Sequence, residues 1–149
     1  MLGKLTPEEC AHLLSSQALG RLACCDGSKP YILPVTYTYD SPFIYGQTND
    51  GQKLEILRKN PTVCFEVEQV TDMRNWKSVL VFGTFEELAG DEEEDARNLL
   101  FGNVFQLMTS STVHLHEHAA TAELDDAARV KYVMYRIRIN EMTGRFEKQ

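Results

Sequence analysis

One lysine stands where a phosphate could bind. An aromatic strand is expected at Phe43–Tyr45, followed by a polar turn at Gln47–Gly51 and by a helix that carries Lys53 in its first turn. The start of a helix offers unpaired backbone N–H groups and the positive end of the helix dipole, so it attracts anions. A lysine at that end is unfavourable for the helix alone. This arrangement predicts that Lys53 holds a phosphate group of a bound cofactor.

Two observations favour an ordinary helix start instead. Lysines are common in first turns, and no glycine-rich phosphate motif accompanies Lys53. Asp50 would repel a phosphate unless its carboxylate turned away or capped the helix. The local sequence leaves both interpretations open.

Other residues could also carry chemistry. His114, His116 and His118 alternate, so on a strand they would share one face and could bind a metal or a haem. A polar loop is the alternative interpretation, and we predict no metal site because no carboxylate or cysteine stands at a supporting spacing. Trp76, the only tryptophan, could line a ligand groove or pack in the core or an interface. No Ser-His-Asp or Cys-His set is evident, so catalytic residues stay unassigned.

The bulk composition predicts a single globular domain over residues 1–149, with 43% hydrophobic residues. The net charge of -7 argues against nucleic acid and anionic membranes as partners, because both are negatively charged. No apolar run is long enough to span a membrane, and the N-terminus lacks a basic-then-apolar signal. The four cysteines show no CxxC or zinc spacing. We therefore expect a reduced, cytoplasmic protein.

The elements that position Lys53 are mostly strands. Alternating and β-branched runs separated by turn signals predict at least six strands, at Arg21–Cys25, Tyr31–Tyr39, Phe43–Thr48, Val63–Val70, Ser78–Glu86 and Tyr132–Asn140. Pro34 interrupts the second of these strands. It should therefore lie at an edge, at a bulge, or where something other than a strand lies alongside. Gly83 indicates a bulge or a close backbone approach.

Three helices should accompany these strands. The first begins with a capping box and an early proline at Thr6–Glu9 and ends near Ser16–Leu19. The second runs from about Gly51 to the stop signal Asn60-Pro61. The third opens with the acidic run Gly90–Asp95. Its buried stripe is expected to comprise Leu99, Leu100, Val104 and Leu107. Many strands with few helices between them favour a mainly β, antiparallel barrel with packed helices.

Several phrases of the sequence align with a known family. They are Gly20–Ala23, Pro30–Tyr37, Ile44–Thr48, Gly51–Lys53, Arg58–Val67, Trp76–Val79, Gly83, Arg136–Ile139 and Met142–Arg145. In this order and spacing, the chain resembles the pyridoxamine 5′-phosphate oxidase-like, flavin-nucleotide-binding split-barrel proteins. It is most similar to the branch of small members that includes the nitroimidazole-resistance proteins. The match is dense from about residue 5 to residue 88 and thin afterwards.

The resemblance implies a six-stranded antiparallel split β-barrel, a homodimer, and FMN in a groove between the subunits, with FAD or a deazaflavin less expected. The implied cofactor-binding residues are Leu33, Pro34, Val35, Thr36, Gln47, Thr48, Lys53, Trp76, Ser78 and Val79. Residues 33–36 would lie beside the isoalloxazine ring, and residues 47, 48 and 53 would hold the ribityl phosphate. Residues 76–79 would approach the phosphate or the ring.

The implied function is a flavin-dependent oxidoreductase that passes electrons from a nicotinamide nucleotide to a small organic acceptor. A non-enzymatic flavin-binding or redox-sensing module is one alternative, and a haem-binding relative is another. Members of this branch often carry a histidine within or just before the Tyr-Gly-x-Thr phrase. Gly46 and Gln47 stand there in this chain, so no histidine-based role is expected at that point. The late basic residues that grip pyridoxal phosphate in larger oxidases have no match, so that substrate is not carried over.

Overall fold

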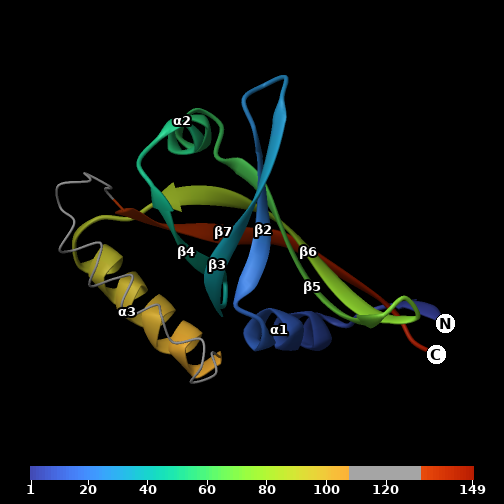
Figure 1. The fold of residues 1–149 in the computed structure, drawn as a ribbon. Helices are drawn as coiled ribbons and strands as arrows, with labels where there is room; N and C mark the ends of the chain where they lie inside the picture. Colours follow the sequence, from blue (N-terminus) through green and yellow to red (C-terminus); the bar gives the residue numbers. More distant parts are fainter. Residues whose placement is uncertain (108–131) are drawn as a thin grey trace.

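The computed structural model describes residues 1–107 and 132–149. The elements follow the order β1 (Leu2–Lys4), α1 (Pro7–Ser16), β2 (Leu19–Cys25), β3 (Pro30–Asp40), β4 (Phe43–Asn49), α2 (Gln52–Lys59), β5 (Thr62–Asp72), β6 (Asn75–Glu87), α3 (Gly90–Leu107) and β7 (Tyr132–Glu147). The strands form one antiparallel sheet in the order β1-β7-β4-β3-β2-β5-β6, and β7 also pairs with β6. Strands β2 to β7 therefore close into a ring (Figure 1). This closure confirms the predicted antiparallel barrel.

The predicted count of six strands is short by one. The seventh, β1, pairs residue by residue with Arg145–Glu147 of β7 and lies outside the closed ring. A strand of three residues is too short to show the alternation from which strands are predicted. The last strand is also longer than expected, because β7 continues past Asn140 to Glu147. The two chain ends consequently lie side by side (Figure 1).

The bulge expected at Gly83 is confirmed. The pairing of β6 with β7 shifts register between Phe82 and Gly83, which face Glu141 and Ile139 respectively. A Cβ atom at Gly83 would lie 2.5 Å from the backbone oxygen of Arg138, so a side chain has no room there. The glycine thus allows the close approach that lets β7 bend along β6.

The first helix begins as its sequence predicts. The Thr6 hydroxyl accepts a hydrogen bond from the Glu9 backbone N–H at 3.2 Å, and the Thr6 N–H donates to Glu9 Oε1 at 2.9 Å. Cys10, Leu13 and Leu14 form the buried face of α1. The helix covers one end of the barrel and closes the core on that side (Figure 1).

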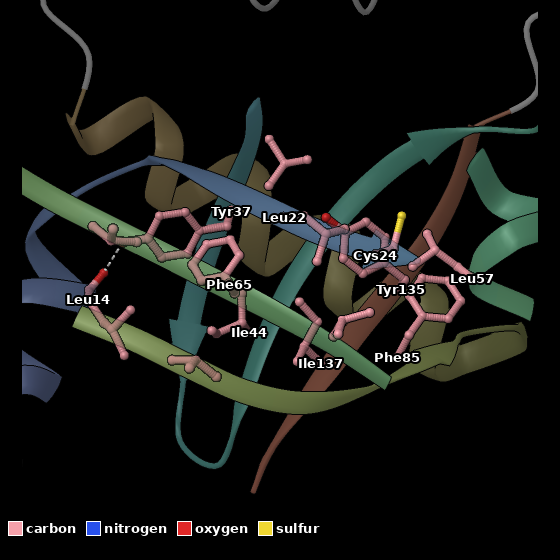
Figure 2. Close-up of a cluster of buried hydrophobic side chains, with 14 of the residues drawn as sticks. Leu14, Leu22, Cys24, Tyr37, Ile44, Leu57, Phe65, Phe85, Tyr135 and Ile137 are labelled. Carbon is pink, nitrogen blue, oxygen red and sulfur yellow. Dashed lines mark hydrogen bonds between the residues drawn. The ribbon is translucent and has the colours of Figure 1, made fainter. Parts of the chain in front are cut away.

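Tyr37 ties α1 to the barrel core. Its ring packs edge-on against Phe65 with 5.0 Å between the ring centroids, and its hydroxyl donates a 2.6 Å hydrogen bond to the Leu14 carbonyl oxygen. Figure 2 shows this pair at one end of the core, with Phe85 and Tyr135 at the other. Burial raises the pKa of Tyr37, so its hydroxyl stays protonated and can donate.

The third helix packs against β3 and β4 (Figure 1), and its buried stripe agrees in part with the expected one. Leu100 and Val104 are buried as predicted, but Ala96 completes the stripe and Leu99 is only half-buried. The side chain of Leu107 lies outside the described part. Asn103 Nδ2 donates to the buried Thr38 Oγ1 on β3 at 2.6 Å and fixes the helix on the barrel. Within the described ranges, no helix has both the length and the apolarity that crossing a membrane requires.

Replacing Tyr37 by Phe should lower the free energy of unfolding by about 1–2 kcal/mol, because the buried Leu14 carbonyl loses its donor. Chemical denaturation of the two proteins measures this difference. Tyr31→Phe is the matched control, since this ring is only half-buried, and it should change the free energy of unfolding by less than about 0.5 kcal/mol. Equal effects of the two substitutions would contradict the role given to the Tyr37 hydroxyl.

Candidate functional site

The strand β3 pairs with one neighbouring strand at a time along its length. Residues Pro30–Thr36 pair with β2, whereas β4 pairs only with Tyr37–Asp40. The stretch from residue 30 to residue 36 is therefore open on one side. Pro34 lies in this stretch, opposite Arg21 of β2, which confirms the expected edge position.

A cavity of about 520 Å³ opens beside this free edge. Three segments form its wall: the open part of β3, the turn from β4 into α2, and one side of α3 together with the start of β7. The described lining residues are Leu33, Pro34, Val35, Thr36, Gln47, Thr48, Asn49, Gly51, Gln52, Lys53, Leu100, Phe101, Val104 and Tyr132. Small-molecule sites typically have volumes of about 300–1,000 Å³, so the cavity has the size of a cofactor site.

The charge of the cavity wall is opposite to that of the whole chain. The sequence contains 22 acidic and 15 basic residues, yet the described lining contains Lys53 and no carboxylate. Within the described ranges, no ion pair joins Lys53 to an acidic side chain. The lysine is therefore a cation at the cavity whose charge no described carboxylate neutralises. Such a wall favours an anionic ligand.

The first turn of α2 adds to this positive potential. Its N-cap is Gly51, which provides no side-chain hydrogen bond to the N–H groups that follow. Leu54, Ile56 and Leu57 are buried and hold the helix on the barrel, while its first residues line the cavity. Unpaired amides and the positive dipole end thus face the same space as Lys53.

Asp50 does not oppose this potential directly. Every residue from Gln47 to Lys53 lines the cavity except Asp50. The Asp50 carboxylate lies instead 4.0 Å from Nη1 of Arg58 at the other end of α2. The repulsion that the sequence left as an objection to phosphate binding is thereby reduced, because the carboxylate is turned toward a cation.

Gln47 carries an oxygen that lacks a partner. Its Oε1 atom is buried, and no donor in the described ranges reaches it. A buried acceptor without a donor costs about 1–3 kcal/mol, so native proteins rarely keep one without reason. Because Gln47 lines the cavity, a ligand that brings a donor would remove this cost.

Seven of the ten residues predicted to bind the cofactor lie together at this cavity: Leu33, Pro34, Val35, Thr36, Gln47, Thr48 and Lys53. The other three lie elsewhere. Trp76 lines a second cavity of about 580 Å³ beside the chain ends and donates from Nε1 to Glu147 at 3.1 Å. Ser78 donates to Glu66 at 2.8 Å, and Val79 points into the barrel and is fully buried. Within one chain, β6 therefore does not reach the cavity, and a cofactor role for these three stays a prediction.

The sequence missed the wall that α3 supplies. Leu100 and Val104 are recognisable as an apolar helix face, but the same pattern fits ordinary core packing. Nothing local marks Phe101 or Tyr132 as lining the same cavity as Lys53, because the three residues come from segments distant in sequence. The three alternating histidines, His114–His118, lie outside the described residues.

Comparisons with known proteins agree with this geometry. A family model described as pyridoxamine 5′-phosphate oxidase matches residues 6–146. An uncharacterised protein of Rhizobium meliloti (strain 1021) is 38% identical over 84 residues, which are 56% of this chain and 56% of that protein. The match thus spans little more than half the length of this relative.

Two solved structures share the fold. The FAD-binding protein of Mesorhizobium loti superposes with a TM-score of 0.71 and 27% identity, over 100% of this chain and 98% of that one. The FAD- and haem-binding protein of Mycobacterium smegmatis gives a TM-score of 0.70 at 16% identity, over 99% of this chain and 74% of that one, which shows a common fold. Since the family model spans nearly the whole sequence, the chain belongs to the pyridoxamine 5′-phosphate oxidase family.

Proposed function

We propose that this chain binds a flavin nucleotide, FMN, in the cavity beside β3. The observation that carries the proposal is that three features meet at one cavity. They are the start of α2, which has no side-chain cap, the Lys53 ammonium, which has no described ion-pair partner, and the Gln47 Oε1 atom, which has no described hydrogen-bond donor. The similarity to the FAD-binding protein of Mesorhizobium loti supports a flavin as the ligand. FMN is preferred over FAD because the cavity offers one cationic end, at the start of α2.

The end of the cavity at α2 suits a phosphate. A phosphomonoester carries about -1.5 to -2 charges near neutral pH and offers strong acceptor oxygens. The Lys53 ammonium, the first N–H groups of α2 and the Thr48 hydroxyl are the donors that line this end. They would hold the phosphate by charge-assisted hydrogen bonds.

The opposite part of the cavity suits a flat ring with one polar edge. The open side of β3, at residues 33–36, presents backbone groups that no strand covers. These groups, together with Gln47 Oε1, would bond the polar edge of the ring. Leu100, Phe101 and Val104 form an apolar wall that would cover the ring and exclude water.

We infer an oxidoreductase function from this fit. A bound flavin supplies hydride and electron transfer, so the protein needs only to bind, orient and shield it. The described lining holds no histidine and no carboxylate, and no side chain there is assigned as an acid or a base. The proposed reaction moves electrons from a nicotinamide nucleotide to a small organic acceptor.

We assign no redox role to the cysteines. All four are free thiols. Burial raises the pKa of the Cys10, Cys24 and Cys64 thiols, so they remain protonated and poorly reactive at neutral pH. Four unpaired cysteines suit a reducing compartment, and we propose a cytoplasmic location.

We also propose that a second copy of the chain covers one outer face of the sheet. Ile32, Ala23, Cys64 and Phe82 pair directly in a row across β3, β2, β5 and β6. Ile32 is 71% exposed and Phe82 43% exposed, so the row forms an apolar patch on the surface. Arg21 and Glu66 follow in the next row, so two copies facing each other could pair unlike charges.

This face continues into the cavity. Pro34 lies on the same face of β3 as Ile32, two residues away, and also lines the cavity. A symmetric partner on this face would therefore lie beside the cavity mouth. Residues 76–78, which do not reach the cavity of their own chain, could approach that of the partner.

Purified protein should be yellow and should release FMN, which mass spectrometry of the denatured sample distinguishes from FAD and deazaflavins. A nicotinamide nucleotide should bleach the flavin absorbance in stopped-flow mixing, and a small organic acceptor should restore it. Colourless protein that binds no added flavin would refute the binding proposal. Bound flavin without turnover of any acceptor would refute the enzymatic proposal and leave a flavin carrier.

Replacing Lys53 by Ala should weaken FMN binding by at least about tenfold. A hydrogen bond to a charged group contributes about 1.5–3 kcal/mol, and about 1.4 kcal/mol corresponds to a tenfold change in affinity. Riboflavin, which has no phosphate, should bind both proteins equally. Lys59→Ala removes the same charge at the far end of α2 and is the control. Titration of flavin fluorescence measures the affinities, and an unchanged FMN affinity in the Lys53 variant would remove this residue from the site.

Replacing Ile32 by Glu should separate the proposed dimer, because each protomer would bury a new charge in the apolar row. Analytical ultracentrifugation should show a dimer for the natural chain and a monomer for the variant. Asn98→Glu adds the same charge on the exposed side of α3 and should leave the mass unchanged. A natural chain that sediments as a monomer at micromolar concentration would overturn the proposal.

A further inference from the structure

Asp50 is an internal competitor for the site that we propose for a phosphate. It directly precedes Gly51, the N-cap of α2, and this cap makes no side-chain hydrogen bond. A carboxylate next to a helix start is attracted by the same N–H groups and the same dipole end as a phosphate. It would also be attracted by Lys53. An Asp50 side chain that turned toward the cavity would therefore occupy or neutralise the anion site.

The carboxylate of Asp50 faces Arg58 instead. The Nε and Nη2 atoms of Arg58 donate to the two carboxylate oxygens of Glu87 at 2.8 Å and 3.1 Å, which fixes the plane of the guanidinium. Its Nη1 atom then points to Glu55 at 2.9 Å and lies 4.0 Å from Asp50 Oδ1. Glu87 ends β6, so the cation that faces Asp50 is anchored to the barrel rather than free on the helix.

The position of Asp50 relative to the cavity agrees with its contact to Arg58. Asp50 is the single member of the Gln47–Lys53 run that does not line the cavity, and it is the member that faces Arg58. The bonds to Glu87 and Glu55 raise the pKa of Arg58, so the guanidinium is charged at every pH at which the protein is folded. Its hold on Asp50 therefore does not depend on protonation of the arginine.

We propose that Arg58 is a positioning residue for anion binding: by holding the Asp50 carboxylate away from the first turn of α2, it keeps the amide end and Lys53 open to the phosphate. This inference rests on the proposed function, because it concerns the phosphate end of the same site. Arg58 itself does not line the cavity. Its effect on binding is therefore transmitted through Asp50.

The test compares Arg58→Ala, Asp50→Ala and the double variant, with FMN and riboflavin as the two ligands. Arg58→Ala should weaken FMN binding by about fivefold, the size of a charge effect at a helix start, and should leave riboflavin binding within about twofold. Asp50→Ala should bind FMN at least as well as the natural chain. The double variant should recover FMN affinity, because the competitor is absent. Flavin fluorescence titration measures all of these affinities.

The controls separate positioning from folding. Glu55→Gln removes the charge of another partner of Arg58 and leaves Asp50 in place, so it should not change FMN affinity. The double variant lacks the same contacts to Glu87 as Arg58→Ala, so a loss that is merely structural would persist in it. A double variant as weak as Arg58→Ala, or a parallel loss of riboflavin binding, would overturn the inference. If the natural chain binds neither flavin, the proposed function fails and this inference fails with it.

Discussion

The site depends on one backbone constraint, the incomplete pairing of β3. Buried N–H and C=O groups must be paired, and a closed barrel satisfies this requirement by giving each strand two neighbours. In this barrel each residue of β3 has a strand partner on one side only: residues 30–36 pair with β2 and residues 37–40 pair with β4. Residues 30–36 keep one open side, and proline is tolerated at residue 34 because no ladder on that side needs its missing N–H. The cavity lies where the second ladder stops.

Arginines fix the direction of several acidic side chains in the described part of the chain. Arg58 binds Glu87 and Glu55, and Arg136 binds Glu86 at 2.7 Å and lowers the pKa of that carboxyl. Pairs of this kind add little to stability when they are exposed. Their consequence here is spatial, because they fix where carboxylates point. Although the chain has a net charge of -7, the described residues of the cavity wall carry a single positive charge.

The parts of the fold that the sequence predicted are those encoded by local chemistry. The capping box of Thr6 and Glu9, the edge at Pro34 and the bulge at Gly83 each follow from constraints on a few consecutive residues, and each is confirmed. The seven predicted residues that line the cavity all lie in two short sequence segments, residues 33–36 and residues 47–53. The β1 strand and the α3 wall were missed for the opposite reason. Leu2–Lys4 pairs with the end of the chain, and Phe101 lines the same cavity as Lys53. Both arrangements bring distant segments together, and no local pattern marks them.

The two predicted phrases can act as one site because rigid elements carry both of them. β4 is held against β7 by a glycine at residue 46, where a Cβ atom would collide with the Tyr135 ring. α2 is held by three buried side chains on a helix of only eight residues. The turn between these elements is thus fixed at both ends, and every residue from Gln47 to Lys53 except Asp50 lines the cavity. Binding at such a site loses little conformational entropy, so a modest set of donors can hold a nucleotide.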